Sequence, residues 1–150
     1  MAVLIPALST CKRKMTPGEK RLGERLEQKL EDDYLIWYEP AIGPRALRPD
    51  FLVLHPRRGI LVLEVKDWRI STLRNVDKLQ VELLTEQGIK KDRNPFEQGR
   101  VYALELANLL SRDPALVQTG GDWAGKLLCP WSHGVVLANV TRAQFEAHEL

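Results

Sequence analysis

Three side chains that could do chemistry mark the ends of an otherwise apolar stretch of the sequence. Asp50 lies at the start of the segment PDFLVLHPRRGILVLEVK, and Glu64 and Lys66 lie at its end. Carboxylate oxygens are the ligands that Mg²⁺ prefers, and a water held by such an ion is acidic enough to become a nucleophile. A nearby lysine can orient that water or stabilise charge on a transferring phosphoryl group. The three residues therefore indicate metal-assisted phosphoryl chemistry, provided that the fold brings them together.

The apolar residues between these groups predict a β-hairpin that is buried on both faces. Side chains alternate along a strand, so Glu64 and Lys66 share one face. A two-residue turn would pair Asp50 with Val65 and send the aspartate to the opposite face. A three-residue turn, Arg57–Gly59, uses its glycine in the left-handed conformation and pairs Asp50 with Lys66. We predict this second register, which gathers all three polar groups at one end of one face.

The charges of this group suggest a bound cation. Two buried carboxylates beside one lysine leave a negative charge whose desolvation costs several kcal/mol. A divalent ion, Mg²⁺ or Mn²⁺, would remove that cost, and Asp50, Glu64 and the backbone carbonyl of Val65 could supply three of its oxygen ligands. The alternative is a plain structural role, in which Asp50 is a turn residue after Pro49 and Glu64 forms an ion pair with Lys66 at a strand end. Both interpretations are open at this point.

The rest of the sequence predicts helices on either side of the sheet to which this hairpin belongs. Thr16 can cap a helix that starts at Pro17, and Glu19 completes a capping box. Asn94 can cap a second helix. The predicted order is a helix at 16–32, strands at 34–39, 50–55 and 60–66, a strand pair within 69–91 turning near 87–88, a helix at 94–111, a loop at 113–130, a strand at 134–140 and a helix from 141 to the end. This order favours an α/β fold with a mixed central β-sheet flanked by helices.

Composition narrows the class of protein. The 150 residues suit one domain, and the net charge of +2 permits a nucleic-acid partner without requiring one. The two cysteines and three histidines have no zinc-ligand spacing, which argues against a zinc site. No signal peptide is recognisable, and no apolar run reaches the ~18 residues of a membrane span, so we expect a soluble, cytoplasmic protein. The abrupt end of the last predicted helix suggests the N-terminal part of a longer polypeptide.

The polar residues of the hairpin also form a known signature. Pro49-Asp50, thirteen further residues and then Glu64-Val65-Lys66 resemble the PD-(D/E)XK nuclease signature. Five blocks together resemble the nuclease-related domain, NERD: Gly18-Glu19, Arg48–Phe51, Arg58–Ile60, Leu63–Trp68 and Asn94–Gln98. The resemblance covers roughly residues 16–139, and the opening MAVLIPALS and the hairpin are similar to NERD modules at the N-terminus of superfamily 1 helicases.

The resemblance carries expectations about fold and activity. It implies a restriction-endonuclease-like core over residues 16–150, preceded by an N-terminal extension over residues 1–15, with a helicase domain following in the same polypeptide. It also implies a Mg²⁺-dependent deoxyribonuclease that acts on DNA, with DNA repair as its setting. The family roles match Asp50 and Glu64 as metal-binding carboxylates and Lys66 as the catalytic lysine. They further match Glu19 as an acidic residue of the first helix, and Gln98 and Tyr102 as a Gln-x-x-x-Tyr pattern on a later helix.

The helical periodicity bears on two of these matches. Glu19 falls within the apolar stripe of its helix, so it faces the core, where one glutamate could cap the helix and also reach a metal-bound water. A pure capping role is the alternative. Gln98 lies beside Tyr102 at the edge of the apolar face of its helix. It could donate a hydrogen bond to Lys66 or to a nucleotide, or it could be an ordinary boundary residue.

Basic and aromatic residues outside the hairpin are candidates for contacts with nucleic acid. The cations that could line a phosphate track are Lys12, Arg13, Lys14, Arg45, Arg48, Lys90, Lys91, Arg93 and Arg100. Such residues are equally typical of a solvated surface. Trp123 and Trp131, in or beside the predicted loop, could stack on bases, whereas Trp37 and Trp68 are expected in the core.

Three functions agree with these patterns. The first is a metal-dependent DNA nuclease. The second is a docking or regulatory module of a helicase that binds nucleic acid without cutting it. The third is a structural interaction domain, which predicts no affinity for DNA and no stabilisation by divalent ions.

Overall fold

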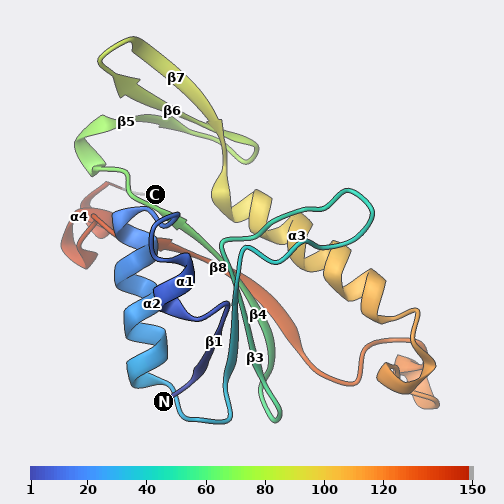
Figure 1. Ribbon diagram of the computed structural model, residues 1–150. Helices are drawn as coiled ribbons and strands as arrows, with labels where there is room; N and C mark the ends of the chain where they lie inside the picture. Colours follow the sequence, from blue (N-terminus) through green and yellow to red (C-terminus); the bar gives the residue numbers. More distant parts are fainter. Residues whose placement is uncertain (149–150) are drawn as a thin grey trace.

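The computed structural model describes residues 1–148 (Figure 1). Its strands are β1 (Val3–Ile5), β2 (Leu35–Tyr38), β3 (Phe51–His55), β4 (Gly59–Lys66), β5 (Leu73–Val76), β6 (Gln80–Thr85), β7 (Gly88–Arg93) and β8 (Trp131–Leu137). Its α-helices are α1 (Leu8–Cys11), α2 (Pro17–Lys29), α3 (Pro95–Leu110) and α4 (Arg142–Ala147), and three short 3₁₀ turns are η1 (Ile70–Thr72), η2 (Pro114–Leu116) and η3 (Gly121–Trp123). Residues 149–150, where the last predicted helix would end, lie outside the described residues.

A five-stranded mixed sheet forms the centre of the fold, in the order β1-β2-β3-β4-β8. The two outer pairs, β1 with β2 and β4 with β8, are parallel, and the inner pairs are antiparallel. Helix α2 covers one face of this sheet and α3 covers the other (Figure 1). The predicted α/β fold with a mixed central sheet between helices is confirmed.

Strand β4 is buried on both faces because its side chains feed two separate cores. Leu63 and Val65 belong to the core under α2, which includes the fully buried Phe51 and Ile36. Val62 belongs to the second core under α3. Alternation along the strand therefore places Glu64 on the α3 side of the sheet, with Val62. This is why a charged residue of the hairpin has no access to bulk water.

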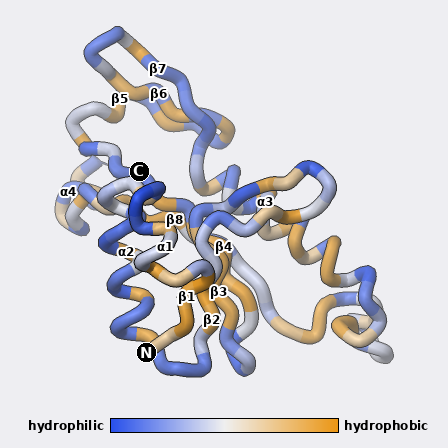
Figure 2. The backbone as a smooth tube through the Cα atoms, viewed as in Figure 1, coloured by the Kyte–Doolittle hydropathy of each residue, from blue (hydrophilic) through white to orange (hydrophobic). Residues whose placement is uncertain are grey.

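A second, three-stranded antiparallel sheet, β5-β6-β7, lies beyond the Lys66 end of β4 (Figure 1). The strand pair predicted within 69–91 is confirmed as β6–β7, in which Thr85 pairs with Gly88 across the turn, and β5 adds a third strand. Leu73, Val81 and Leu83 form a small apolar cluster with Trp68 and Ile70 packed against it. The turn between β6 and β7 is hydrophilic (Figure 2). The small sheet is thus packed against Trp68 and Ile70, the residues that follow β4 of the main sheet.

Three of the helices begin at the positions that their capping residues predicted. Thr16 and Glu19 form both hydrogen bonds of a capping box, Asn94 caps α3, and Thr141 caps α4. The ends were predicted less well: α2 ends at Lys29 instead of residue 32, and β8 runs over 131–137 instead of 134–140. The short turns η2 and η3 lie in the predicted loop at 113–130. No helix among residues 1–148 has both the length and the apolarity that crossing a membrane requires.

The N-terminal residues are part of the fold. Strand β1 pairs with β2 at the edge of the main sheet, and Ala2 and Leu4 are buried in the core under α2. The apolar start of the sequence is therefore explained by packing. The division of the chain at residue 15, which came from the resemblance alone, stays a prediction.

The register predicted for the β3–β4 hairpin is wrong by two residues. His55 pairs with Gly59 and Phe51 with Leu63, so the turn consists of Pro56–Arg58, and the next position in this register sets Asp50 opposite Glu64 instead of Lys66. The backbone N–H of Arg57 donates to His55 Nδ1, which holds proline inside the turn. The left-handed conformation predicted for Gly59 is confirmed, with φ of 89°. A shift of two residues preserves the face of every side chain, so Asp50 and Glu64 still point the same way.

Candidate active site

Asp50 and Glu64 lie together, just before β3 and near the end of β4, and each carboxyl group accepts a backbone hydrogen bond from across the hairpin. The backbone N–H of Val65 donates to Asp50 Oδ2 at 2.7 Å, and the backbone N–H of Asp50 donates to Glu64 Oε1 at 3.3 Å. Glu64 is only 3% exposed. The hairpin therefore fixes both carboxyl groups before any ligand arrives.

Burial shifts the ionisation of this pair. It raises the pKa of the Glu64 carboxyl to about 8, and the nearby charge of Asp50 adds to the effect. Burial also raises the pKa of Asp50 above its usual range, and for both groups it outweighs the opposing effect of the Lys66 charge. The pair titrates as a unit, and the site does not readily hold two negative charges on its own.

A divalent cation fits this donor set. A positive ion would remove the energetic cost that the raised pKa of Glu64 expresses, and an all-oxygen site suits Mg²⁺ or Mn²⁺. Within residues 1–148, no group of three or more His, Cys, Asp or Glu side chains is arranged to hold a metal. Asp50, Glu64 and the carbonyl of Val65 would provide three oxygen ligands, and Mg²⁺ in proteins commonly keeps several of its waters.

Lys66, the last residue of β4, has its ammonium directed toward the small sheet. Its Nζ lies 3.8 Å from Asp92 Oδ2 and 5.7 Å from the centre of the Trp68 ring. The salt bridges found in the described part of the chain do not join Lys66 to Asp50 or Glu64. The lysine is therefore near the carboxylate pair in the fold, yet its closest charged contact is Asp92, a residue that the sequence did not single out.

Glu19 faces the core from the first turn of α2, as its position in the apolar stripe predicted. It is 7% exposed, and its Oε2 accepts hydrogen bonds from the Tyr38 hydroxyl at 2.7 Å and from the backbone N–H of Thr16 at 3.2 Å. Burial raises the pKa of Glu19, and the charge of Asp50 raises it further. Glu19 is a cap and is also close enough to Asp50 to feel its charge. Tyr38, which holds Glu19, was not predicted as a site residue.

Gln98 and Tyr102 contact each other one turn apart on α3. Gln98 Nε2 donates to the Tyr102 hydroxyl at 2.7 Å. The hydrogen bonds of the described residues do not link Gln98 to Lys66. Tyr102 is 8% exposed and packs with Val62 in the core under α3, so its ring has no open face for a base. Any contact of this pair with nucleic acid would have to involve Gln98.

Two glycines let the helices approach this end of the sheet. A Cβ atom at Gly18 of α2 would lie 2.3 Å from Asp67 Oδ1, directly after Lys66 in sequence. A Cβ atom at Gly99 of α3 would lie 3.7 Å from Glu64 Cγ and 3.6 Å from His133 Cβ. The close approach of α3 at Gly99 helps to keep water away from Glu64, and this burial is the main cause of its raised pKa.

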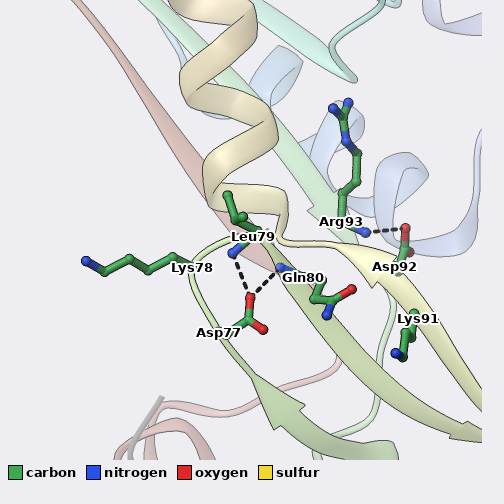
Figure 3. Close-up of a pocket in the computed structure, with 7 residues that line it drawn as sticks. All are labelled: Asp77, Lys78, Leu79, Gln80, Lys91, Asp92 and Arg93. Atoms are coloured by element: carbon green, nitrogen blue, oxygen red, sulfur yellow. Dashed lines mark hydrogen bonds between the residues drawn. The ribbon is translucent and has the colours of Figure 1, made fainter.

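A groove with three basic and two acidic residues lies on the small sheet (Figure 3). We call it the β7 groove. It has a volume of about 700 Å³ and is lined by Asp77, Lys78, Leu79, Gln80, Lys91, Asp92 and Arg93. Asp77 Oδ1 accepts the backbone N–H groups of Leu79 and Gln80, which closes the β5–β6 turn. Asp92 is one of the lining residues, and its Oδ2 also contacts Lys66.

The other predicted contacts are more dispersed. Arg45 pairs with Glu105 at 3.3 Å, and Arg48 donates to the carbonyl of Glu39 at 2.9 Å, both from the loop between β2 and β3. Lys12, from the basic run 12–14, lies 3.5 Å from Glu24. These cations are exposed, so the contacts leave them available to an anionic ligand.

Two residues proposed for nucleic-acid contact lie elsewhere. Trp131 pairs with Ile60 at the opposite end of β4 from Lys66, about 20 Å away along the strand, so it does not adjoin the carboxylate pair. Arg100 is held by Glu97 through two hydrogen bonds at 2.8 and 2.6 Å. Neither residue belongs to the β7 groove.

Comparison with known proteins adds one finding. The family model described as nuclease-related domain, NERD, matches residues 14–137. The matched segment includes the carboxylate pair, Lys66, Glu19 and the whole of the small sheet. No curated protein and no solved structure matches the chain.

Proposed function

The chain belongs to the nuclease-related domain family, and from that premise we propose that it is a metal-dependent nuclease that hydrolyses phosphodiester bonds in DNA. One observation carries the proposal: the buried carboxyl group of Glu64 and the half-buried one of Asp50 are fixed side by side at a strand end, where the pKa of Glu64 is raised to about 8. A purely structural ion pair would lower such a pKa, because an opposite charge favours the ionised form. The arrangement is therefore typical of a site that awaits a cation.

The chain's own residues have distinct parts in this proposal. When bound, a divalent cation such as Mg²⁺ or Mn²⁺ would supply an acidified water and positive charge opposite the phosphate. Asp50, Glu64 and the Val65 carbonyl would hold it. The Lys66 ammonium would donate hydrogen bonds to the negative charge that develops on the phosphoryl oxygens. Glu19 would accept a hydrogen bond from a water at the edge of the site.

The substrate backbone would follow the basic residues. Lys91 and Arg93 line the β7 groove, Lys90 is the exposed neighbour of Lys91, and Arg45 and Arg48 lie in the loop before β3. Each phosphate that they neutralise releases condensed counterions. We expect replacement of Lys91 by alanine to weaken DNA binding and to reduce the slope of log affinity against log salt concentration by about 0.7–0.9. Binding of the variant at several salt concentrations, measured by fluorescence anisotropy, tests this.

A second function has one observation in its favour. Lys66 contacts Asp92 and forms no salt bridge with the carboxylate pair among the described residues. This suits a nucleic-acid docking or regulatory module that binds without cutting, acting for a helicase domain in the same polypeptide. We place either activity in the cytoplasm. The nuclease is our first choice because a docking role alone gives no reason for burying Glu64 beside a second carboxyl group.

Cleavage of labelled DNA by the purified chain separates the two functions. Single- and double-stranded DNA are incubated with and without Mg²⁺ or Mn²⁺. We expect metal-dependent shortening that falls at least about 100-fold in Asp50→Ala and in Lys66→Ala, while Glu82→Gln, a charge change on the small sheet, cleaves like the wild type. Cleavage that survives in both variants would refute the assignment. DNA that is shifted in a gel but never shortened would favour the docking module.

A further inference from the structure

The small sheet holds Lys66 from two sides. Asp92 Oδ2 on β7 lies 3.8 Å from Lys66 Nζ, and the Trp68 ring lies 5.7 Å from the same atom. The side chain of Lys66 is 22% exposed, and that of Asp92 is 33% exposed. Both contacts are therefore partly shielded from water, and both act on the charged end of a side chain that is otherwise free to rotate.

The carboxyl group of Asp92 is itself fixed. Its Oδ1 accepts the backbone N–H of Arg93 at 2.9 Å, which leaves Oδ2 for Lys66 (Figure 3). On the neighbouring strand Asp92 pairs with Val81, which is 2% exposed. Asp92 therefore lies directly beside the best-buried position of the small sheet.

The same apolar cluster places the second contact. Trp68 packs against Leu73, Val81 and Leu83, the core of the small sheet. Asp92 and Trp68 are thus located by one packed unit, although one is on β7 and the other follows β4. Any movement of that unit moves both contacts of the lysine together.

We propose that Asp92 is a positioning residue for Lys66, and that the small sheet serves to hold the ammonium group of the catalytic lysine in place. The inference rests on the proposed nuclease function. A lysine has a long flexible stem, and an ammonium fixed before the substrate binds needs less ordering in the transition state. Asp92 acts through Lys66 and has no part in holding the metal.

Strand β7 carries residues of the groove as well as Asp92. Lys91 and Arg93 flank Asp92 on β7 and line the groove that a DNA backbone would follow. Because side chains alternate along a strand, Lys91 and Arg93 point to the opposite face from Asp92, so β7 would contact phosphates with one face and Lys66 with the other.

Asp92→Asn tests the role of the charge, because asparagine keeps the size of the side chain. Glu82→Gln is the matched control: it removes one negative charge from the same sheet, but Glu82 pairs with Lys91 and so lies on the opposite face from Asp92. We expect Asp92→Asn to lower kcat about tenfold and to change KM less than about twofold, because ordering of Lys66 is needed only in the transition state. Asp92→Glu, which keeps the charge, should recover part of the rate.

A second measurement does not depend on activity. The ε-methylene signal of Lys66 in a carbon–proton spectrum is assigned by its loss in Lys66→Arg, and the nearby Trp68 ring should displace it from the other lysines. We expect Asp92→Asn to move this signal toward the exposed lysines and Glu82→Gln to leave it in place.

Each outcome decides a separate question. An unchanged Lys66 signal in Asp92→Asn would overturn the inference, and so would a variant that cleaves DNA as fast as the wild type or faster. If the wild type cleaves no DNA, the proposed nuclease function fails, and the Lys66 signal still decides whether Asp92 positions the lysine.

Discussion

Replacing Glu64 by glutamine should make the metal-free protein more stable at alkaline pH, although it removes a residue of the candidate active site. Glutamine keeps an oxygen that can accept the N–H of Asp50, and it cannot ionise. The wild-type glutamate must either keep its proton or carry a buried charge beside Asp50. The glutamine variant stays neutral at every pH, so it buries no charge at this position.

The sign and size of this difference in the free energy of unfolding follow from the pKa of Glu64. It is raised from 4.5 to about 8, so below pH 4.5 the carboxyl is protonated in both the folded and the unfolded chain. Between 4.5 and 8 the unfolded chain releases the proton first, and the free energy of unfolding of the wild type falls as pH rises. The full difference would correspond to roughly 5 kcal/mol. We expect about 1–3 kcal/mol, because charges inside proteins are screened by an effective dielectric constant near ~20.

Urea unfolding followed by tryptophan fluorescence measures the effect. Wild type, Glu64→Gln and the control Glu82→Gln are compared at about pH 5, 7 and 8.5, where the variant's advantage should grow with pH. Mg²⁺ should raise the melting temperature of the wild type at alkaline pH and leave Glu64→Gln unchanged. A variant that is no more stable than the wild type at pH 8.5, or whose advantage does not depend on pH, would refute the reasoning.

Two further substitutions probe the surroundings of the site. Tyr38→Phe removes the 2.7 Å hydrogen bond to Glu19 and should lower the free energy of unfolding by about 1–2 kcal/mol in urea. That bond holds the pKa of Glu19 down against burial, so the acidic limb of the pH–rate profile should move to higher pH; a profile that stays in place would exclude a role for ionised Glu19. Gly59→Ala should cost more than about 2 kcal/mol, because the residue has a φ of 89° and its Cβ would lie 2.0 Å from the Pro130 carbonyl oxygen. Gly121→Ala, with a φ of 75° and no neighbour within 4 Å, is its control and should cost only about 1–2 kcal/mol; equal losses would show that the contact with Pro130 is unimportant.

Much of the fold could be predicted because local signals agree with it. Capping residues at Thr16 and Asn94 give the starts of the two long helices, and the apolar strands give the sheet. The shared face of Asp50 and Glu64 follows from alternation alone. The exact register does not, because Pro56 enters the turn and Gly59 is pressed against Pro130, a residue far along the chain whose position no local pattern reveals.

The candidate site residues that the sequence singled out in the hairpin lie close together in the chain, whereas those that it missed lie on other elements. The carboxylate pair and Lys66 lie within one hairpin, and the signature that they form agrees with the family match. Asp92 and Tyr38 belong to other elements and reach the site through tertiary packing. Asp92 in particular lies within a stretch, GIKKDR, whose alternation of charges reads as a solvated strand. Only the position of the small sheet shows that one of its faces contacts Lys66.

The parallel pairing of β4 with β8 has a consequence for how the protein acquires its chemistry during synthesis. Glu64 pairs with Val135, so the strand that lies beside it in the sheet leaves the ribosome long after the hairpin does. Until β8 pairs, Glu64 lacks one of the two strands that flank it in the folded sheet. The raised pKa of Glu64 therefore depends on contacts between distant parts of the chain. A mutation in β8 could change this pKa without replacing any residue of the candidate site.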